Sequence, residues 1–95
     1  MSYKLTPLAK KHIKQIWTHT HKKWGETQAD KYTNAIKKCL SYIAKNPSKG
    51  RSRDEVSSGL KSHKVEHHHI FYFIAKNEIE VVGILHKQMD PLRHI

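Results

Sequence analysis

Between Val65 and Asp90 the chain reads VEHHHIFYFIAKNEIEVVGILHKQMD, where apolar residues are denser than anywhere else in the sequence. Two segments within it, Ile70 to Ala75 and Ile79 to Leu85, are rich in β-branched and aromatic residues. A short polar link, Lys76 to Glu78, joins them. This pattern predicts a β-hairpin at the centre of a sheet.

Alternation along the two strands assigns their side chains to faces. In the first strand it places Ile70, Tyr72 and Ile74 on one face and Phe71, Phe73 and Ala75 on the other. In the second it places Ile79, Val81, Gly83 and Leu85 on one face, opposite Val82 and Ile84. Because neither face of the hairpin is polar, both faces need cover.

The segment before the hairpin predicts a short strand and a helix. Ser2 to Thr6 is the strand candidate, and Pro7 suits the first position of a helix. From Leu8 to Trp24 apolar residues recur every three or four positions, which predicts an amphipathic helix that ends at Gly25.

A second helix is expected directly afterwards. Thr27 to Asp30 fits a capping pattern at its start, and Asn46-Pro47 ends it. Two amphipathic helices joined by so short a link must lie antiparallel. Pro47 to Ser58 is polar and turn-rich, which predicts a loop, and Ser62 to Glu66 predicts a further strand.

The predicted fold class is α+β, in the order β-α-α-β-β-β, with a helical hairpin packed on one face of a small, mostly antiparallel sheet. The other face has only loops and tails for cover. A partner segment could bind there, or the C-terminal tail and the loop before the hairpin could fold over it, or a second copy of the chain could cover it. These alternatives stay open from sequence.

Length and charge narrow the class of protein. The chain has 95 residues, which predicts a single domain over residues 1–95. Eighteen Lys and Arg against eight Asp and Glu give a net charge of +10, which favours nucleic acid, a nucleoprotein or an acidic protein segment as partner. The alternative is a charged surface that only keeps the protein soluble. The lone Cys39, the lack of a long apolar run and the lack of a leader-like N-terminus predict a cytoplasmic protein without membrane attachment.

Nine His residues raise the question of a metal site, above all at His67, His68 and His69. In a strand, His67 and His69 share a face and His68 does not, so the run supplies at most two ligands, with His63 or His86 as possible neighbours. No ligand motif accompanies it. We therefore expect neither a metal nor a cofactor.

Nucleophilic hydrolysis lacks support, since no GxSxG motif is present and Cys39 lies on the apolar stripe of the second helix. Metal-free RNA cleavage stays open, because it needs a base, an acid and cations for the transition state. The chain offers residues of those types: Arg51, Arg53, Glu55, Lys61, His63, His86 and Lys87.

Six blocks in order resemble the ParE branch of the RelE/ParE toxin superfamily: LTPLAKKHIKQIW, WGETQADKY, NPSKGRSRDEV, GLKSH, HIFYFI and VVGILHKQMD. The resemblance spans Leu5 to Asp90. It implies two N-terminal helices on a small antiparallel sheet, and a protein that inhibits DNA gyrase by trapping its cleaved complex with DNA instead of acting as an enzyme. It also implies a cognate ParD-like antitoxin, with which the toxin forms a hetero-oligomer that reaches promoter DNA only through the antitoxin.

On this resemblance we expect gyrase to contact the C-terminal segment at His86, Lys87, Met89 and Arg93. We expect the antitoxin to contact Trp17, Trp24, Phe71 and Phe73. One block departs from the ParE pattern, because Phe73 stands where Arg or Gln often follows IFY.

Two alternatives come with the same superfamily. A RelE-like ribosome-dependent mRNA endoribonuclease would use Arg51, Arg53, Lys61 and His86, but no Tyr follows His86 as in that branch. A homologue that has lost toxicity could persist as an antitoxin partner or corepressor.

Overall fold

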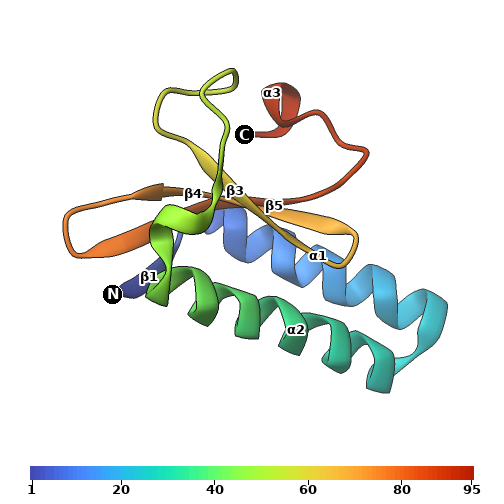
Figure 1. Cartoon of the computed structure of the whole chain (residues 1–95). Helices are drawn as coiled ribbons and strands as arrows, with labels where there is room; N and C mark the ends of the chain where they lie inside the picture. Colours follow the sequence, from blue (N-terminus) through green and yellow to red (C-terminus); the bar gives the residue numbers. More distant parts are fainter.

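The computed structural model describes residues 1–95 and confirms the α+β class (Figure 1). Along the chain its elements are β1 (Ser2–Leu5), α1 (Pro7–Trp24), α2 (Glu26–Lys45), the 3-10 helix η1 (Pro47–Lys49), β2 (Arg51–Ser52), β3 (Lys61–Val65), β4 (His68–Ile74), β5 (Glu78–His86) and α3 (Pro91–His94). They form one five-stranded sheet in the order β1-β5-β4-β3-β2. Only β1 pairs in parallel, with β5, so the sheet is mostly antiparallel as predicted.

Gly25 joins the two long helices more tightly than the sequence suggested. It has φ 91°, a left-handed conformation that favours glycine, and its N–H donates to the carbonyl of His21 to close α1. The same residue is the N-cap of α2, which has no side-chain cap. The predicted capping role of Thr27 is therefore wrong, because α2 has already begun at Glu26.

A β-bulge in β5 changes the predicted faces of that strand. Phe71 pairs with Gly83 while Tyr72 pairs with Val81, so Val82 is an extra residue in the ladder. Beyond Val82 the alternation shifts by one. The predicted placement of Gly83 and Leu85 with Ile79 and Val81 is wrong, and Ile84 instead joins those two on the face toward the helices.

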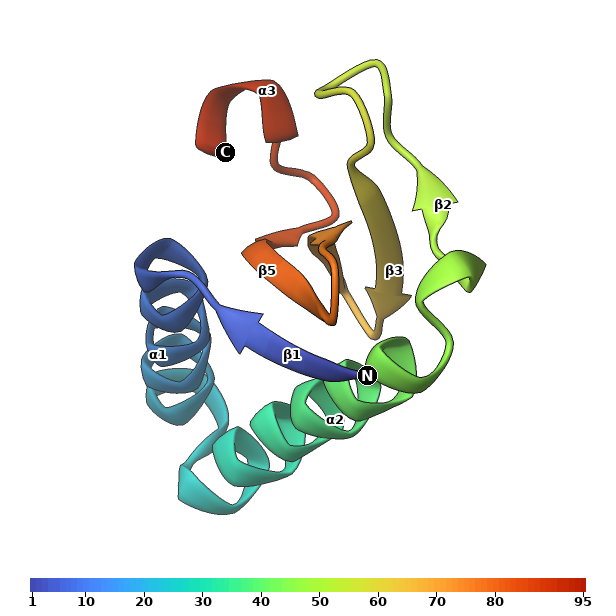
Figure 2. The same cartoon turned by 90° about the vertical axis from the view of Figure 1, so that its left-hand side faces the viewer.

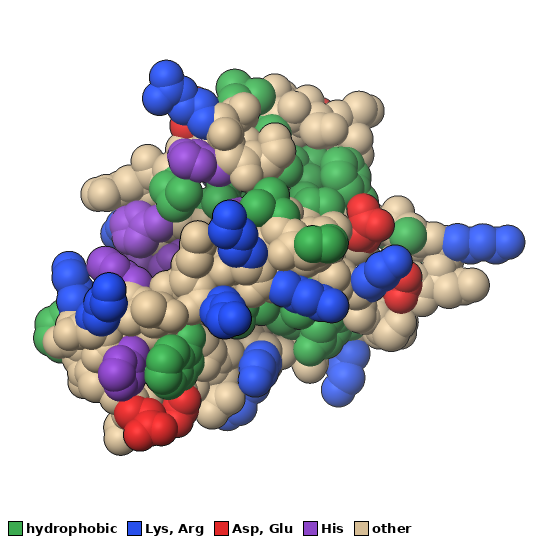
Figure 3. Space-filling model, turned by 180° about the vertical axis from the view of Figure 1, so that it is seen from behind, with side chains coloured by type: hydrophobic (Ala, Val, Ile, Leu, Met, Phe, Trp, Pro, Cys, Tyr) green, Lys and Arg blue, Asp and Glu red, His purple; other side chains and the backbone are tan.

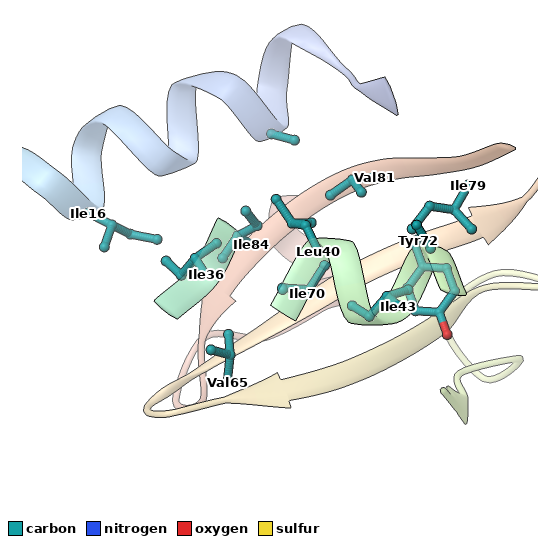
Figure 4. Close-up of a cluster of buried hydrophobic side chains, with 12 residues drawn as sticks. Ile16, Ile36, Leu40, Ile43, Val65, Ile70, Tyr72, Ile79, Val81 and Ile84 are labelled. Atoms are coloured by element: carbon teal, nitrogen blue, oxygen red, sulfur yellow. The ribbon is translucent and has the colours of Figure 1, made fainter. Parts of the chain in front are cut away.

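The main core lies between the helical hairpin and one face of the sheet (Figure 4). Ile36, Leu40 and Ile43 of α2 are fully buried there. Among the strand residues, Ile70, Tyr72 and Val81 meet them and are buried to the same degree. The predicted helical hairpin on one face of the sheet is confirmed.

Loop and tail cover much of the opposite face, which is one of the alternatives left open by the sequence (Figure 2). Leu60, Phe71 and Leu85 are almost fully buried in a small second cluster. The Arg53 guanidinium lies 5.2 Å from the centroid of the Phe71 ring. At the other end of this face, Ile95 lies against Gly83.

No helix in the chain is long and apolar enough to cross a membrane.

Candidate functional site

A groove lined by imidazoles runs between α1 and the paired ends of β4 and β5. Its first part is a cavity of about 280 Å³ lined by His12, Gln15, Ile16, His19, Thr20, His68, Ile84, His86 and Met89. Its second part, of about 780 Å³, extends along α2 and shares His19, Thr20, His68 and His86 with the first. We call the two together the imidazole groove. Figure 3, seen from the α1 side, shows His side chains gathered at one side of the molecule.

Strand register and helix spacing bring these imidazoles together. His68 begins β4 and pairs directly with His86 at the end of β5, and their rings meet edge to face with centroids 5.3 Å apart. Both face the helices, because alternation places them with Ile70 and Ile84. His12 and His19 lie seven residues apart on α1, close to two helical turns, so they share the side that faces the strands.

Tyr32 of α2 fixes the orientation of His68. The backbone N–H of His67 donates to Tyr32 Oη over 3.1 Å, and Tyr32 Oη lies 2.6 Å from Nδ1 of His68. The hydroxyl accepts from His67 and still has its own proton, which it can donate to Nδ1 when the ring proton of His68 is on Nε2.

His12 closes an open edge of the sheet. β1 pairs with β5 only as far as Val81, and beyond it the backbone N–H of Ile84 donates to Nδ1 of His12 over 3.1 Å. An accepting Nδ1 requires the neutral ring. Burial first, then the charges of His94 and Lys11, lowers the pKa of His12, which agrees with this role.

Burial also lowers the pKa of His68 from 6.5 to about 4, assisted by the charges of His86, His67, His19 and His69. At neutral pH the ring is therefore uncharged. Burial likewise raises the pKa of Tyr32, so its hydroxyl stays protonated. With the neutral rings of His12 and His68 and the apolar side chains of Ile16, Ile84 and Met89, the groove can accept a partner side chain by packing and hydrogen bonding.

The residues predicted to contact gyrase divide into two pairs. His86 and Met89 line the imidazole groove, and Nδ1 of His86 accepts from the N–H of Gln88 over 3.2 Å. Lys87 and Arg93 are exposed and do not line the groove. Their role as target contacts stays a prediction.

The residues predicted to contact the antitoxin lie in two separate places. Trp24 is 71% exposed and lines the larger part of the groove. Trp17 holds the helices together, because its Nε1 donates to Asp30 over 2.9 Å and its ring stacks on His21. Phe71 is only 1% exposed beneath Arg53, while Phe73 is half-buried on the same sheet face. Phe71 thus has almost no surface to offer a partner.

The structure does not assemble the residues named for RNA cleavage. His86 faces the helices, whereas Arg51 and Arg53 lie on the opposite face, where their charges, after burial, help to lower the pKa of His69. Lys61 pairs with Tyr72, at the far end of β3 from His86. No single transition state could contact all four side chains.

The His run is also divided between environments. His68 enters the groove, whereas His69 lies on the opposite sheet face and tilts toward Phe71. His63, a possible neighbour of the run, instead contacts Tyr42 and lies 3.5 Å from the Cys39 sulfur. No group of three or more His, Cys, Asp or Glu side chains is placed to hold a metal ion.

Sequence reasoning missed His12, Tyr32 and His68 as groove residues. His12 and Tyr32 looked like members of apolar stripes, and the pairing of His68 with His86 depends on the hairpin register. The available signal was a polar aromatic side chain, His12 or Tyr32, within the otherwise apolar stripe of each helix. That signal alone does not show which end of the sheet these side chains contact.

Comparison with known proteins places this fold and sequence in a family. Residues 3–91 match the family model described as ParE toxin of type II toxin-antitoxin system, parDE. The chain is 34% identical to Toxin ParE1 of Mycobacterium tuberculosis (strain ATCC 25618 / H37Rv) over 98% of this chain and 96% of that protein. It is 27% identical to Toxin ParE1 of Caulobacter vibrioides over 98% and 96% of the two chains.

A solved structure of the chromosomal ParDE TA system from P. aeruginosa shares the fold, with a TM-score of 0.80 at 20% identity over 90% of this chain and 95% of that chain. The family match includes both long helices, β1 from Tyr3 onward, the other four strands and the residues of the imidazole groove. The chain therefore belongs to the ParE toxin family of type II toxin-antitoxin systems.

Proposed function

We propose that the protein is the toxin of a toxin-antitoxin pair and that it inhibits DNA gyrase by trapping the cleaved gyrase-DNA complex, with no catalytic activity of its own. The observation that carries this proposal is the family match over residues 3–91. The matched curated relatives from M. tuberculosis and C. vibrioides are themselves named ParE toxins.

The side chains that line the imidazole groove favour a protein as the target. Its imidazoles at His12 and His68 have lowered pKa values, so they bring little positive charge, and its walls include Ile16, Ile84 and Met89. Partly apolar cavities of this kind accept an anchoring side chain from a protein partner. In the proposal, gyrase contacts His86 and Met89 inside the groove, with Lys87 and Arg93 on its rim.

A ParD-like antitoxin is the proposed partner, in a hetero-oligomer. Trp24 offers the antitoxin an exposed aromatic anchor, and it lines the same cavity as His86. A segment bound over Trp24 would therefore cover His86 and exclude gyrase. Phe73 is a second proposed contact, on the opposite face of the sheet, which a flexible segment reaches only by wrapping around the domain edge.

Ribonuclease activity has less support than gyrase inhibition. The cations Arg51 and Arg53 lie across the sheet from His86, so the general acid or base and the transition-state cations are separated by the sheet itself. No other feature described above favours RNA cleavage.

The test incubates gyrase with relaxed plasmid, ATP and the purified protein, followed by detergent and protease. Linear plasmid that accumulates with the protein and disappears when antitoxin is added would support the proposal. Normal supercoiling without linear plasmid would contradict it, and a translating extract would then show whether messenger RNA is cut instead. Intact messenger together with harmless expression in the absence of antitoxin would indicate a homologue without toxicity.

A matched pair of variants tests the groove. Met89→Ala removes an apolar side chain from the groove, while Ile74→Ala removes one of similar exposure from the far end of β4, 37% against 44% exposed. Trapping should fall with Met89→Ala and persist with Ile74→Ala. Equal trapping by both variants would remove Met89 from the proposed contact.

A further inference from the structure

The exposed side of α1 holds an open depression of about 410 Å³ with no apolar residue in its lining. It is lined by Lys11, Lys14, Gln15, Thr18, His19 and Lys22. It adjoins the imidazole groove, with which it shares Gln15 and His19. Its chemistry differs from that of the groove, because every lining side chain is polar and three are cationic.

The lysines of α1 have no counterion within the protein. The helix carries five Lys residues and no Asp or Glu (Lys10, Lys11, Lys14, Lys22 and Lys23). The whole chain has 18 Lys and Arg but forms one ion pair, between Arg53 and Glu55. In Figure 3 the Lys and Arg side chains spread over this side of the molecule, with acidic side chains toward its margins. An external anion is therefore the natural complement of this surface.

The composition of the depression distinguishes between classes of anion. An acidic protein segment that folds on binding uses apolar anchors, and none of the residues that line the depression itself is apolar. Single-stranded nucleic acid needs aromatic side chains on which bases stack. Neither indole of α1 lines the depression: Trp17 is held by Asp30 and stacked on His21, and Trp24 lines the larger part of the imidazole groove. The phosphate backbone of a duplex needs only cations and hydrogen-bond donors.

The row of lysines on α1 is long enough to contact several phosphates of a duplex. Lys11 and Lys22 lie about 16 Å apart along the axis at roughly 1.5 Å per helical residue. Over that length one strand of duplex DNA carries about five phosphates, at roughly 3.4 Å of duplex axis for each. Gln15 between the lysines adds a neutral hydrogen-bond donor.

We propose that α1 binds the phosphate backbone of duplex DNA through Lys11, Lys14 and Lys22. The contact carries no sequence information, so promoter recognition still requires the antitoxin. The binding itself does not depend on gyrase. Its biological setting rests on the proposed function, in which the trapped complex holds DNA beside the bound toxin.

The test measures fluorescence anisotropy of a labelled 20-base-pair duplex of arbitrary sequence, without gyrase, over a range of salt concentrations. The triple variant Lys11→Gln/Lys14→Gln/Lys22→Gln is compared with Lys37→Gln/Lys38→Gln/Lys45→Gln, which removes the same charge from exposed positions of α2. The α1 variant should bind about 10-fold more weakly or worse at low salt, and its slope of log affinity against log salt should be shallower by about 2 to 3. The α2 variant should stay close to wild type.

Equal losses in the two triple variants would overturn the proposal, because binding would then follow net charge alone. Lack of duplex binding by the wild type at low salt would overturn it too. Poly-glutamate is the competing probe: loss of poly-glutamate binding with unchanged duplex binding in the α1 variant would assign the surface to an acidic polypeptide. Single Lys→Gln variants at the three positions, each expected to reduce the slope by about 0.9, serve if the triple variant fails to fold. Because gyrase is absent, failure here leaves the plasmid-cleavage result untouched.

Discussion

Replacing Gly50 by Ala should force the Tyr72 hydroxyl out of its place. Gly50 has φ −66° and ψ 151°, which Ala adopts without strain. A Cβ at this position, however, would overlap Tyr72 Oη and lie 2.8 Å from its Cζ. Tyr72 is fully buried, and its hydroxyl donates to the carbonyl of Pro47 over 2.7 Å, so the ring has no free space into which to move.

The magnitude follows from these two effects. Overpacking a filled site costs about 1–3 kcal/mol, and loss of the hydroxyl's hydrogen bond costs about 1 kcal/mol. Gly50→Ala should therefore lower the free energy of unfolding by about 2–4 kcal/mol, measured by urea denaturation. Tyr72→Phe alone should cost about 1 kcal/mol.

The double variant isolates the steric clash. Tyr72→Phe removes the overlapping oxygen, so Gly50→Ala/Tyr72→Phe should be more stable than the sum of the single effects by about 1 kcal/mol or more. Gly25→Ala is the control, since Gly25 has φ 91° and no atom within 4 Å of an added Cβ. Its loss should come from backbone strain and should add to that of Tyr72→Phe. A Gly50→Ala protein within about 0.5 kcal/mol of wild type, or strict additivity in the double variant, would refute the reasoning.

Three further predictions concern stability and reactivity. The pKa of His68 is lowered from 6.5 to about 4 in the folded protein, so between these pH values the unfolded protein binds a proton at His68 that the folded protein does not. The resulting contribution to the free energy of unfolding, about 1–3 kcal/mol, is complete above pH 6.5 and disappears as the pH falls to about 4. The free energy of unfolding of His68→Gln, measured by denaturation, should therefore depend less on pH across this range. Leu40→Ala should lower the free energy of unfolding by about 2–5 kcal/mol because Leu40 is fully buried, whereas Leu92→Ala, at a side chain that is 64% exposed, should change it little; equal effects in urea titrations would contradict the core described for α2. Burial raises the pKa of the Cys39 thiol, so its alkylation by iodoacetamide at pH 7.5 should be slower than that of a free cysteine peptide and should accelerate in urea; equal rates in native buffer would show an exposed thiol.

Most of the fold could be predicted because its signals are local. Pro7 and Gly25 bracket α1, Asn46-Pro47 ends α2, and the apolar hairpin strands lie within a residue or two of their predicted bounds. The bulge at Val82 could not be read from alternation, since an extra residue leaves no mark in the composition of the strand. β2 has only two residues and pairs with β3 across the loop, so its existence depends on tertiary contact.

The imidazole groove was predictable only in part, because most of its contacts join residues far apart in the sequence. His86 ends the last strand and Met89 follows it in sequence, so their position at a sheet end could be inferred. Tyr32 reaches His68 from 36 residues away, and His12 reaches Ile84 from 72 residues away. Such contacts depend on how the helices cross the sheet, which residue patterns do not encode locally. The burial of Phe71 beneath Arg53 also depends on how the loop folds over the sheet, which the sequence pattern did not show.

Gyrase-dependent cleavage of plasmid tests the central claim most directly. The assay compares the linear DNA formed with wild type, with His86→Ala/Met89→Ala and with Ile74→Ala, each with and without antitoxin. We expect linear DNA with wild type and Ile74→Ala, several-fold less with the double groove variant, and none once antitoxin is present. Absence of linear DNA with the folded wild-type protein would contradict gyrase trapping, and undiminished linear DNA with the double variant would contradict the role of the imidazole groove.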